Sequence, residues 1–340
     1  MYDVREIHNA DEWEQFVLAQ PTTLFVQSPS YGKFYEAMGE RYWIFGIYEN
    51  ETLVGGSLVL SVHARRGDFL YLPYGPILDY GDSAMMREFA GHLSQFAKKN
   101  HFDFIRISPF VDDTAESRGV VQLASFRPAP MHMLAETTWM LDLTPPEDTL
   151  LAAMGKNHRN LIRRCIKEGV RVEVKRDNAS LTEFNSMHDA TSKRHEFHRF
   201  SKEYIGKEFQ VFSKNNTALI FHAYLPDGRL DSAAIVMYYG TMAAYRHAAS
   251  LGQDKRLPTS YLLQWEAIRE AKRRGMKWYN FWGIAPADAS KHHPFAGITH
   301  FKRGFGGFQK DLLHCHDLPL SWKYWVNWMI ESARRKKRRF

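Results

Sequence analysis

Short apolar runs and longer stretches with helical spacing alternate along the chain, and this pattern predicts a mixed α/β fold. In the first half it predicts strands at residues 23–27, 42–48, 53–64, 69–72 and 102–107, and helices at 30–38 and 84–99. The longer helix places Met85, Phe89, Leu93 and Phe96 on one face, at spacings of three and four residues. We therefore expect that face to be buried.

The second half repeats this plan. It predicts strands at 218–225, 232–239, 242–248 and 278–282, and a helix at 260–274. The hairpin, the long helix and the strand after it recur at an offset of about 175 residues, which indicates duplication of one domain. We predict two α/β domains, 1–145 and 146–317, with a hinge at 145–148 and residues 318–340 packing back on the first. The groove between the copies is then the expected ligand site.

Composition and charge narrow the class of protein. The N-terminal residues lack a signal-peptide pattern, no apolar run reaches a bilayer-spanning length, and two cysteines exclude a disulfide framework. We expect a cytoplasmic protein. The net charge of +7 favours an anionic partner, and much of it lies in residues 156–167 and 334–339. The first segment predicts a basic amphipathic helix that suits either a phosphate backbone or solvation; the second follows four aromatic residues and suits either a terminal helix docked on the core or an anionic membrane surface.

Residues 300–308, His-Phe-Lys-Arg-Gly-Phe-Gly-Gly-Phe, concentrate candidate chemistry. Glycine disfavours a continuing helix, so we predict one short helical turn that presents Lys302 at the mouth of a cleft and then stops. Positive charge beside exposed backbone N–H groups suits an anionic ligand or a developing oxyanion. A surface turn with solvated cations is the alternative.

Three passages together resemble the Fem family (FemABX) of peptidoglycan-bridge aminoacyltransferases. They are residues 71–76 (Tyr-Leu-Pro-Tyr-Gly-Pro), 106–109 (Arg-Ile-Ser-Pro) and 301–306 (Phe-Lys-Arg-Gly-Phe-Gly). The resemblance implies two tandem acetyltransferase (GNAT)-like domains with a central cleft, here without the coiled-coil arm of longer members. It implies transfer of an amino acid from aminoacyl-tRNA to the stem-peptide amine of UDP-MurNAc-peptide or lipid II. It also implies no cofactor; we expect a monomer, with peripheral contact to the inner membrane face as one option.

The resemblance also implies roles for particular residues. Lys302 matches a lysine that stabilises the tetrahedral intermediate or binds the tRNA end, and Phe301 is its aromatic neighbour. Lys33 and Arg199 match cations that bind the acceptor diphosphate, and Tyr204 and Tyr245 match substrate-contacting tyrosines.

Two positions depart from the family pattern. Ser108 stands where an aspartate that contacts the acceptor amine is usual, and His247 stands where a second tyrosine is usual. Asp103, upstream on the same predicted strand, is a candidate for the missing carboxylate. Both departures put the identity of the acceptor in question.

Other chemistries have weaker support in the sequence. An acyl-CoA-dependent N-acyltransferase needs a glycine-rich pyrophosphate loop, and residues 254–260 contain a proline and no glycine. A catalytically silent RNA- or membrane-associated relative is the third hypothesis. His195 and His198 share a spacing that suits a metal, but no third ligand stands out, so we predict no metal site. Cys165 lies on an apolar helix side, where a thiolate nucleophile is disfavoured.

Overall fold

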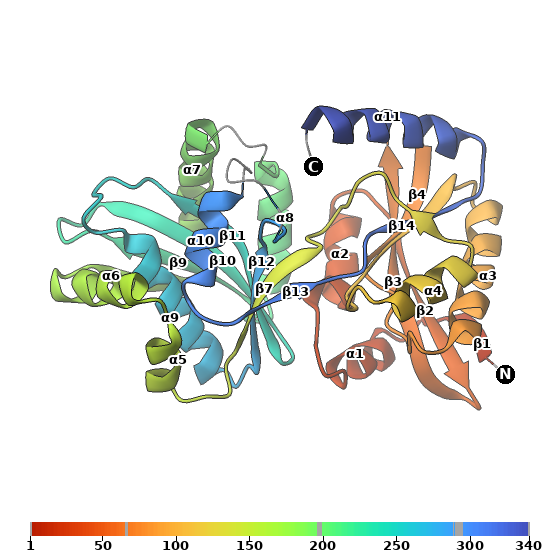
Figure 1. Cartoon of the computed structure of the whole chain (residues 1–340), viewed down its shortest axis with the longest axis horizontal. Helices are drawn as coiled ribbons and strands as arrows, with labels where there is room; N and C mark the ends of the chain where they lie inside the picture. The colour runs from red at the N-terminus through yellow and green to blue at the C-terminus, as the bar shows by residue number, and fades with distance from the viewer. Residues whose placement is uncertain (1, 65–66, 196–198, 288, 290–294, 339–340) are drawn as a thin grey trace. The chain divides into compact units, whose positions relative to one another are not determined.

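The computed structural model describes residues 2–64, 67–195, 199–287, 289 and 295–338, and the chain forms two compact units (Figure 1). The first unit contains Met1–Gln20, Leu24–Glu136 and Lys310–Phe340. The second contains Pro21–Thr23 and Thr137–Gln309. Residues 145–148, predicted as the hinge, lie within the second unit, whereas residues 318–340 belong to the first.

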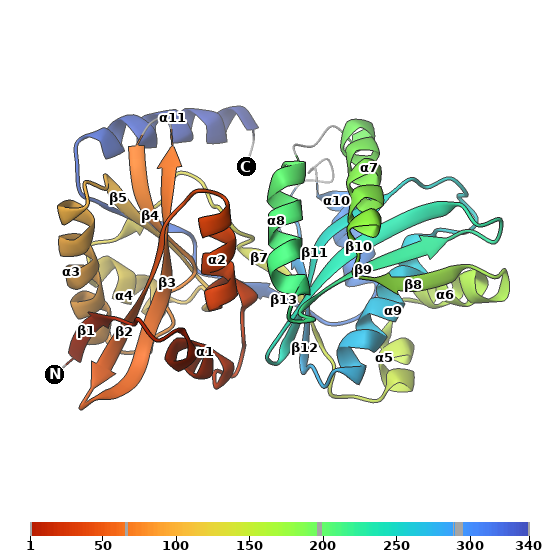
Figure 2. The ribbon, with the colours of Figure 1, turned by 180° about the vertical axis from the view of Figure 1, so that it is seen from behind.

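The first unit is built on a seven-stranded sheet with the order β1-β2-β3-β4-β5-β14-β6. Its strands are β1 (Tyr2–Glu6), β2 (Tyr42–Glu49), β3 (Thr52–Ala64), β4 (Gly67–Tyr74), β5 (Phe104–Pro109), β6 (Arg127–Pro128) and β14 (His316–Pro319). Its helices are α1 (Ala10–Leu18), η1 (Phe25–Gln27, a 3-10 helix), α2 (Pro29–Ala37), α3 (Ser83–Lys99), α4 (Ala115–Leu123) and α11 (Lys323–Arg338). Helices α2 and α3 lie on opposite faces of this sheet (Figures 1 and 2).

Helix α3 shows how closely local pattern and packing agree. Asp82 caps its first turn by accepting hydrogen bonds from the backbone N–H groups of Ala84 and Met85. Met85, Phe89 and Leu93 are buried in the core of the first unit, as their spacing predicted.

The strand predicted at residues 23–27 is wrong, because this segment ends in the short helix η1. Gln27 explains the difference. Its side-chain amide donates to the carbonyl of Pro73 at 2.6 Å and accepts from the N–H of Leu58 at 2.9 Å. The indole N–H of Trp13 donates to the Gln27 carbonyl. The Gln27 carbonyl is thus satisfied by Trp13, and the backbone N–H of Gln27 donates to the carbonyl of Leu24 within the turn, so neither group needs a neighbouring strand.

The second unit repeats the plan of the first on a seven-stranded sheet with the order β13-β7-β12-β11-β10-β9-β8. Its strands are β7 (Thr137–Asp142), β8 (Arg171–Lys175), β9 (Ala218–Tyr224), β10 (Leu230–Tyr239), β11 (Met242–Ser250), β12 (Trp278–Gly283) and β13 (Phe308–Asp311), the last running across the boundary between the units. Its helices are α5 (Glu147–Ala153), α6 (Lys156–Lys167), α7 (Asn178–His195), α8 (Lys202–Ser213), α9 (Thr259–Arg273) and α10 (Ala296–Arg303). In each unit a strand, a long helix and a parallel strand follow an antiparallel pair, β4-α3-β5 in the first and β11-α9-β12 in the second. The predicted duplication of a mixed α/β domain is confirmed.

Candidate functional site

The two copies differ where their parallel strands meet. In the first unit β4 and β5 pair over six residues, from Phe69–Phe104 to Tyr74–Pro109. In the second unit β11 and β12 pair over three residues, from Met242–Trp278 to Ala244–Asn280. Beyond Ala244 and Asn280, β11 and β12 therefore do not pair with each other. The polar groups of these strand ends can make other contacts. The candidate site is built around these strand ends.

The C-terminal part of β11 turns two neighbouring side chains toward one carboxylate. The register between β10 and β11 shifts between Ile235 and Val236, which leaves Arg246 as the extra residue of a β-bulge. Arg246 donates to Glu208 of α8 through Nε and Nη2, at 3.0 and 2.9 Å, and His247 Nε2 lies 2.8 Å from the same carboxylate. All three side chains are buried.

Charge compensation is strong in this group, which we call the Glu208 cluster (Glu208, Arg246 and His247). Burial by itself would raise the pKa of Glu208, but Arg246 and His247 outweigh burial and lower the pKa to about 2. Burial lowers the pKa of His247, although Glu208 opposes this effect. Glu208 is therefore ionised at neutral pH and holds the Arg246 guanidinium in a fixed position.

Aromatic rings surround the guanidinium of Arg246. Its Nη2 donates to the hydroxyl of Tyr204 at 3.1 Å, and Phe200 stacks on the Tyr204 ring at 4.5 Å between centroids. The guanidinium carbon lies 5.2 Å from the centroid of Trp282. Trp282 has a positive φ of 67°, a conformation that non-glycine residues seldom adopt, and Asn280 holds it by accepting its backbone N–H.

Lys302 supports the end of β12. It lies in the last turn of α10, is 5% exposed, and donates from Nζ to the carbonyl of Gly283 at 2.6 Å. Burial lowers the pKa of Lys302 to about 7. The helix is eight residues long rather than the single turn expected, and it stops at Arg303 with Gly304 as its C-cap, where the glycines predicted an end. The expected exposure of Lys302 at the mouth of a cleft is wrong, because the helix turns this side chain inward and Arg303 outward.

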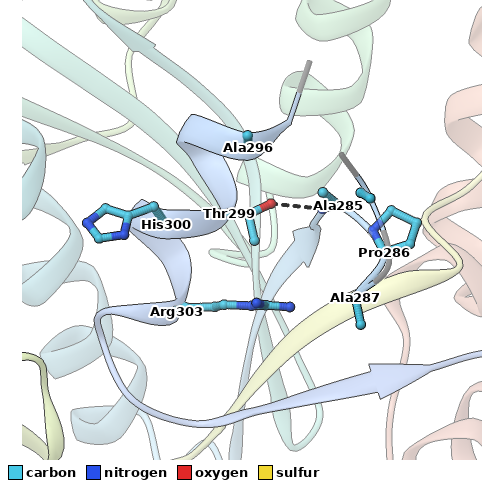
Figure 3. Close-up of a pocket in the computed structure, with 8 residues that line it drawn as sticks. Ala285, Pro286, Ala287, Ala296, Thr299, His300 and Arg303 are labelled. Carbon is cyan, nitrogen blue, oxygen red and sulfur yellow. Dashed lines mark hydrogen bonds between the residues drawn. The ribbon is translucent and has the colours of Figure 1, made fainter. Parts of the chain in front are cut away.

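A shallow pocket of about 270 Å³ lies between this helix and residues 285–287, the segment that follows β12 (Figure 3). Arg303 points toward Pro286 and Ala287 in this view, and Thr299 accepts the backbone N–H of Ala285 at 2.8 Å. The Arg303 guanidinium also lies 5.4 Å from the Trp139 ring centroid. Arg303, and not Lys302, is thus the cation of the motif that lines a surface hollow.

The other predicted residues of the second unit take different positions. Phe301 packs among Tyr261, Phe305 and His158, and its carbonyl lies 2.9 Å from His158 Nε2. Tyr245 belongs to the hydrophobic core, where burial raises its pKa. Both residues thus serve packing, whereas Tyr204 and His247 join Arg246 around Glu208.

Arg199 stands beside the cluster and is held by α7. It donates to the Asp189 carboxylate at 2.6 Å and to both the backbone and the side-chain oxygen of Asn185. His188, also on α7, has its pKa lowered to about 4 by burial, with a further contribution from His247. His198 lies outside the described residues, so the histidine pair considered for a metal is not described.

Two predicted residues lie in the first unit. Lys33 is exposed on α2. Ser108 is buried near the end of β5, where its hydroxyl donates to the sulfur of Cys315 at 3.3 Å. Asp103 does not replace the missing carboxylate, because it precedes β5 at the opposite end of the strand. It is occupied there by the N–H of Asp68 and by the hydroxyl of Ser321.

Sequence reasoning missed Glu208 and Arg246. Glu208 is the acidic member of a helix face that otherwise buries Ile205, Phe209 and Phe212. An acidic residue at helical spacing among buried apolar residues is a signal that could have identified it. Cys165 is buried as expected, and burial raises its pKa to about 11.

Comparison with known proteins places these features in a family. The FemAB family model matches residues 9–126, 129–231 and 229–331, so the chain belongs to the FemAB family. Aminoacyltransferase FemA of Staphylococcus epidermidis is 39% identical over 72 residues, which are 21% of this chain and 15% of that protein. The match thus spans about a seventh of that relative's length.

Solved structures show the same fold. The crystal structure of FemX aligns with a TM-score of 0.85 at 16% identity, over 96% of this chain and all of that one. A tandem GNAT protein from the clavulanic acid biosynthesis pathway aligns with a TM-score of 0.57 at 11% identity, over 94% of this chain and 99% of that one. Each unit of the present chain therefore has an acetyltransferase-like fold, in tandem as predicted.

Proposed function

We propose that this protein is an aminoacyltransferase that moves an amino acid from its tRNA ester to the side-chain amine of a peptidoglycan stem peptide. Membership of the FemAB family across the chain supports this activity, and so does the name of the S. epidermidis relative. The acceptor is a muropeptide carried on UDP or on a lipid. Aminoacyl-tRNA is the co-substrate, no further cofactor takes part, and the protein acts as a monomer.

The reaction needs orientation and charge stabilisation more than a protein nucleophile. The acceptor amine attacks the ester carbonyl, a C–N bond forms, and the C–O bond to the terminal ribose breaks. The amine loses a proton and the ribose oxygen gains one. Negative charge develops on the carbonyl oxygen between these events, where a positioned cation lowers the barrier.

Lys302 is the observation that carries the proposal. Its ammonium is buried, and one donor is used by the carbonyl of Gly283 at the open end of β12. An ammonium has three donors, so two remain for an oxyanion or for the tRNA end. With a pKa of about 7, roughly half of the Lys302 side chains carry the charge at neutral pH, and burial keeps that charge weakly hydrated. Weak hydration makes the charge effective toward an oxyanion.

Coenzyme A chemistry fits the chain less well. The pyrophosphate of coenzyme A needs free backbone N–H groups at a helix start. At the start of α9, the residue before the helix is Pro258, which has no N–H, and the buried Asp231 carboxylate accepts from the hydroxyl of Thr259 at 2.6 Å. At the start of α3, Asp82 already caps the N–H groups. A fixed carboxylate at both helix starts disfavours a diphosphate.

Transfer of a labelled amino acid from charged tRNA to a muropeptide tests the proposal. We expect product with the wild-type protein, and none after the tRNA is digested with ribonuclease before mixing. UDP-linked and lipid-linked muropeptides tested side by side identify the acceptor. Transfer that persists after ribonuclease, or micromolar binding of coenzyme A in a calorimeter, would favour the acyl-CoA hypothesis. Salt-sensitive tRNA binding without transfer would favour a catalytically silent relative.

A further inference from the structure

The C-terminal helix carries an exposed apolar surface that aminoacyl transfer does not use. Among the described residues, 14 large apolar side chains are exposed, and five of them fall between residues 322 and 329. They are Trp322, Trp325, Val326, Trp328 and Met329. Trp322 is 73% exposed and Met329 60%. Concentration of this kind marks an interaction surface, whereas single exposed apolar residues are ordinary.

The opposite side of α11 is fixed to the first unit. Tyr324 is fully buried, and its hydroxyl donates to Asp317 at 3.3 Å. Glu331 lies two helical turns after Tyr324, on the same face of the helix. Its carboxylate accepts from Arg106, which also donates two hydrogen bonds to Asp317. Helix α11 runs along one end of the first sheet (Figures 1 and 2). These contacts set the rotation of the helix about its axis.

With that rotation set, Trp322, Val326 and Met329 lie on the outer side. Their spacings of four and three residues place them in one stripe opposite Tyr324 and Glu331. We call these three residues the outer stripe. The stripe is about 10 Å long at a rise of 1.5 Å per residue. An apolar ridge with an exposed tryptophan on one side of a helix suits the interface between lipid headgroups and acyl chains.

The charge of α11 indicates that its binding partner is anionic. Lys323 and Arg334 are exposed at the two ends of the ridge, and the sequence continues with basic residues from 335 to 339. The single acidic residue of the helix, Glu331, is neutralised by Arg106. The surface that α11 offers therefore combines apolar rings with the exposed cations Lys323 and Arg334, a combination that suits an anionic bilayer.

We propose that α11 docks the protein on an anionic membrane surface, with the outer stripe entering the headgroup region and the basic end binding lipid phosphates. The helix lies on the bilayer in this arrangement; among the described residues there is no helix with the length and hydropathy needed to cross one. The inference is independent of the proposed transfer reaction. A second copy of the chain is the competing occupant, and the net charge of +7 on each copy opposes that contact.

Co-sedimentation of the full chain with vesicles tests the proposal. Vesicles of phosphatidylglycerol and phosphatidylcholine are compared with vesicles of phosphatidylcholine alone, at about 0.1 M and about 1 M salt, where the Debye length falls from about 10 to about 3 Å. We expect binding to the anionic vesicles at low salt and its loss at high salt. Equal binding to both vesicle types, or no binding to the anionic ones, would overturn the proposal.

Two variants separate the apolar from the charged contribution. The triple variant Trp322→Ser, Val326→Ser and Met329→Ser removes the outer stripe without changing charge. Arg334→Gln, Lys336→Gln and Lys337→Gln remove three cations, each expected to weaken binding about fivefold. Leu18→Ser, Leu123→Ser and Met133→Ser form the matched control, because these exposed apolar residues lie elsewhere on the first unit.

We expect both test variants to lose at least tenfold in vesicle affinity and the control to match the wild type. Circular dichroism and the thermal midpoint verify that each variant is folded. Equal affinity of the wild type and either test variant contradicts the proposal. So does a dimer of the wild type that light scattering detects and that the serine variant abolishes, because the outer stripe would then be covered by a second copy.

Discussion

Lys302 shows how much a single position depends on its surroundings. The sequence identified this lysine by its place between an aromatic residue and three glycines. Its burial, its partner Gly283 and its pKa of about 7 follow from the packing of α10 against β12. Burial is costly for the charged form, so this residue is held at a cost to folding. That cost depends on pH in a predictable direction.

We predict that Lys302→Met abolishes transfer and stabilises the protein more at pH 6 than at pH 9. The folded-state pKa of about 7 lies below the ordinary lysine value of 10.5, so the unfolded chain binds more protons between these values. The free energy of unfolding of the wild type therefore rises with pH in this window, and the penalty is largest below pH 7. The stabilisation by methionine should differ by about 3 kcal/mol between the two pH values.

Urea unfolding at each pH gives this difference. Lys310→Met is the control: Lys310 is a partly exposed lysine that pairs with Asp112 in the first unit. Stabilisation by Lys302→Met that is equal at pH 6 and pH 9 would show that the lysine is not buried in its charged form. Retained transfer activity would remove Lys302 from the mechanism while leaving the burial argument intact.

The Glu208 cluster makes the complementary point about residues that local pattern does not reveal. A buried glutamate and arginine are tolerated because each neutralises the other and their hydrogen bonds are satisfied. Their pairing joins residues 38 positions apart in sequence. Neither residue belongs to a recognisable motif, so only the packing of α8 on β11 identifies them as a unit.

At the scale of elements, helix α6 formed where its pattern predicted it. Ile162 and Cys165 are buried, while Lys156, Arg163 and Lys167 are exposed. Ile166, next to Cys165 in the sequence, is 56% exposed. His158 takes part in the buried face instead, because its ring contacts Tyr261 and the carbonyl of Phe301. The predicted basic face of α6 is thus confirmed as exposed surface.

We predict that this basic face binds the phosphate backbone of tRNA. The triple variant Lys156→Gln, Arg163→Gln and Lys167→Gln should make the slope of log affinity against log salt shallower by about 2 to 3. The reason is that fewer phosphate contacts form, so fewer counterions are released on binding. Filter binding over a range of salt concentrations measures the slope. Arg87→Gln, Lys98→Gln and Lys99→Gln, three exposed cations of α3, form a control with the same charge change. An equal loss in both variants would indicate that only net charge matters.

At the scale of the whole molecule, the chain returns to its first unit after completing the second. Strand β14 pairs with β5 on one side and β6 on the other, so residues 316–319 complete the first sheet. Asp317 on this strand is buried with Arg106. Removal of one partner from such a pair leaves an uncompensated charge. The first unit therefore depends on residues near the C-terminus.

We predict that truncation after Gln309 destroys the fold of the first unit, because it removes an inner strand and the partners of Arg106. Limited proteolysis with mass spectrometry should then locate new cleavage sites in residues 24–136. Truncation after Ala333 removes the basic tail alone and should leave the proteolytic pattern of that unit unchanged. Protection of residues 24–136 in the shorter chain would show that the sheet is stable without β14.

The sequence by itself determined the class of fold, the duplication and most elements of both units. These depend on the spacing of apolar residues and on turn residues, which act over a few positions. Tertiary structure decided which copy opens between its parallel strands, that Lys302 faces inward, and that Glu208 joins Arg246 and His247. The physical reason is that strand separation, burial and the pKa shifts that follow from it arise from contacts between distant segments. No local pattern of residues encodes them.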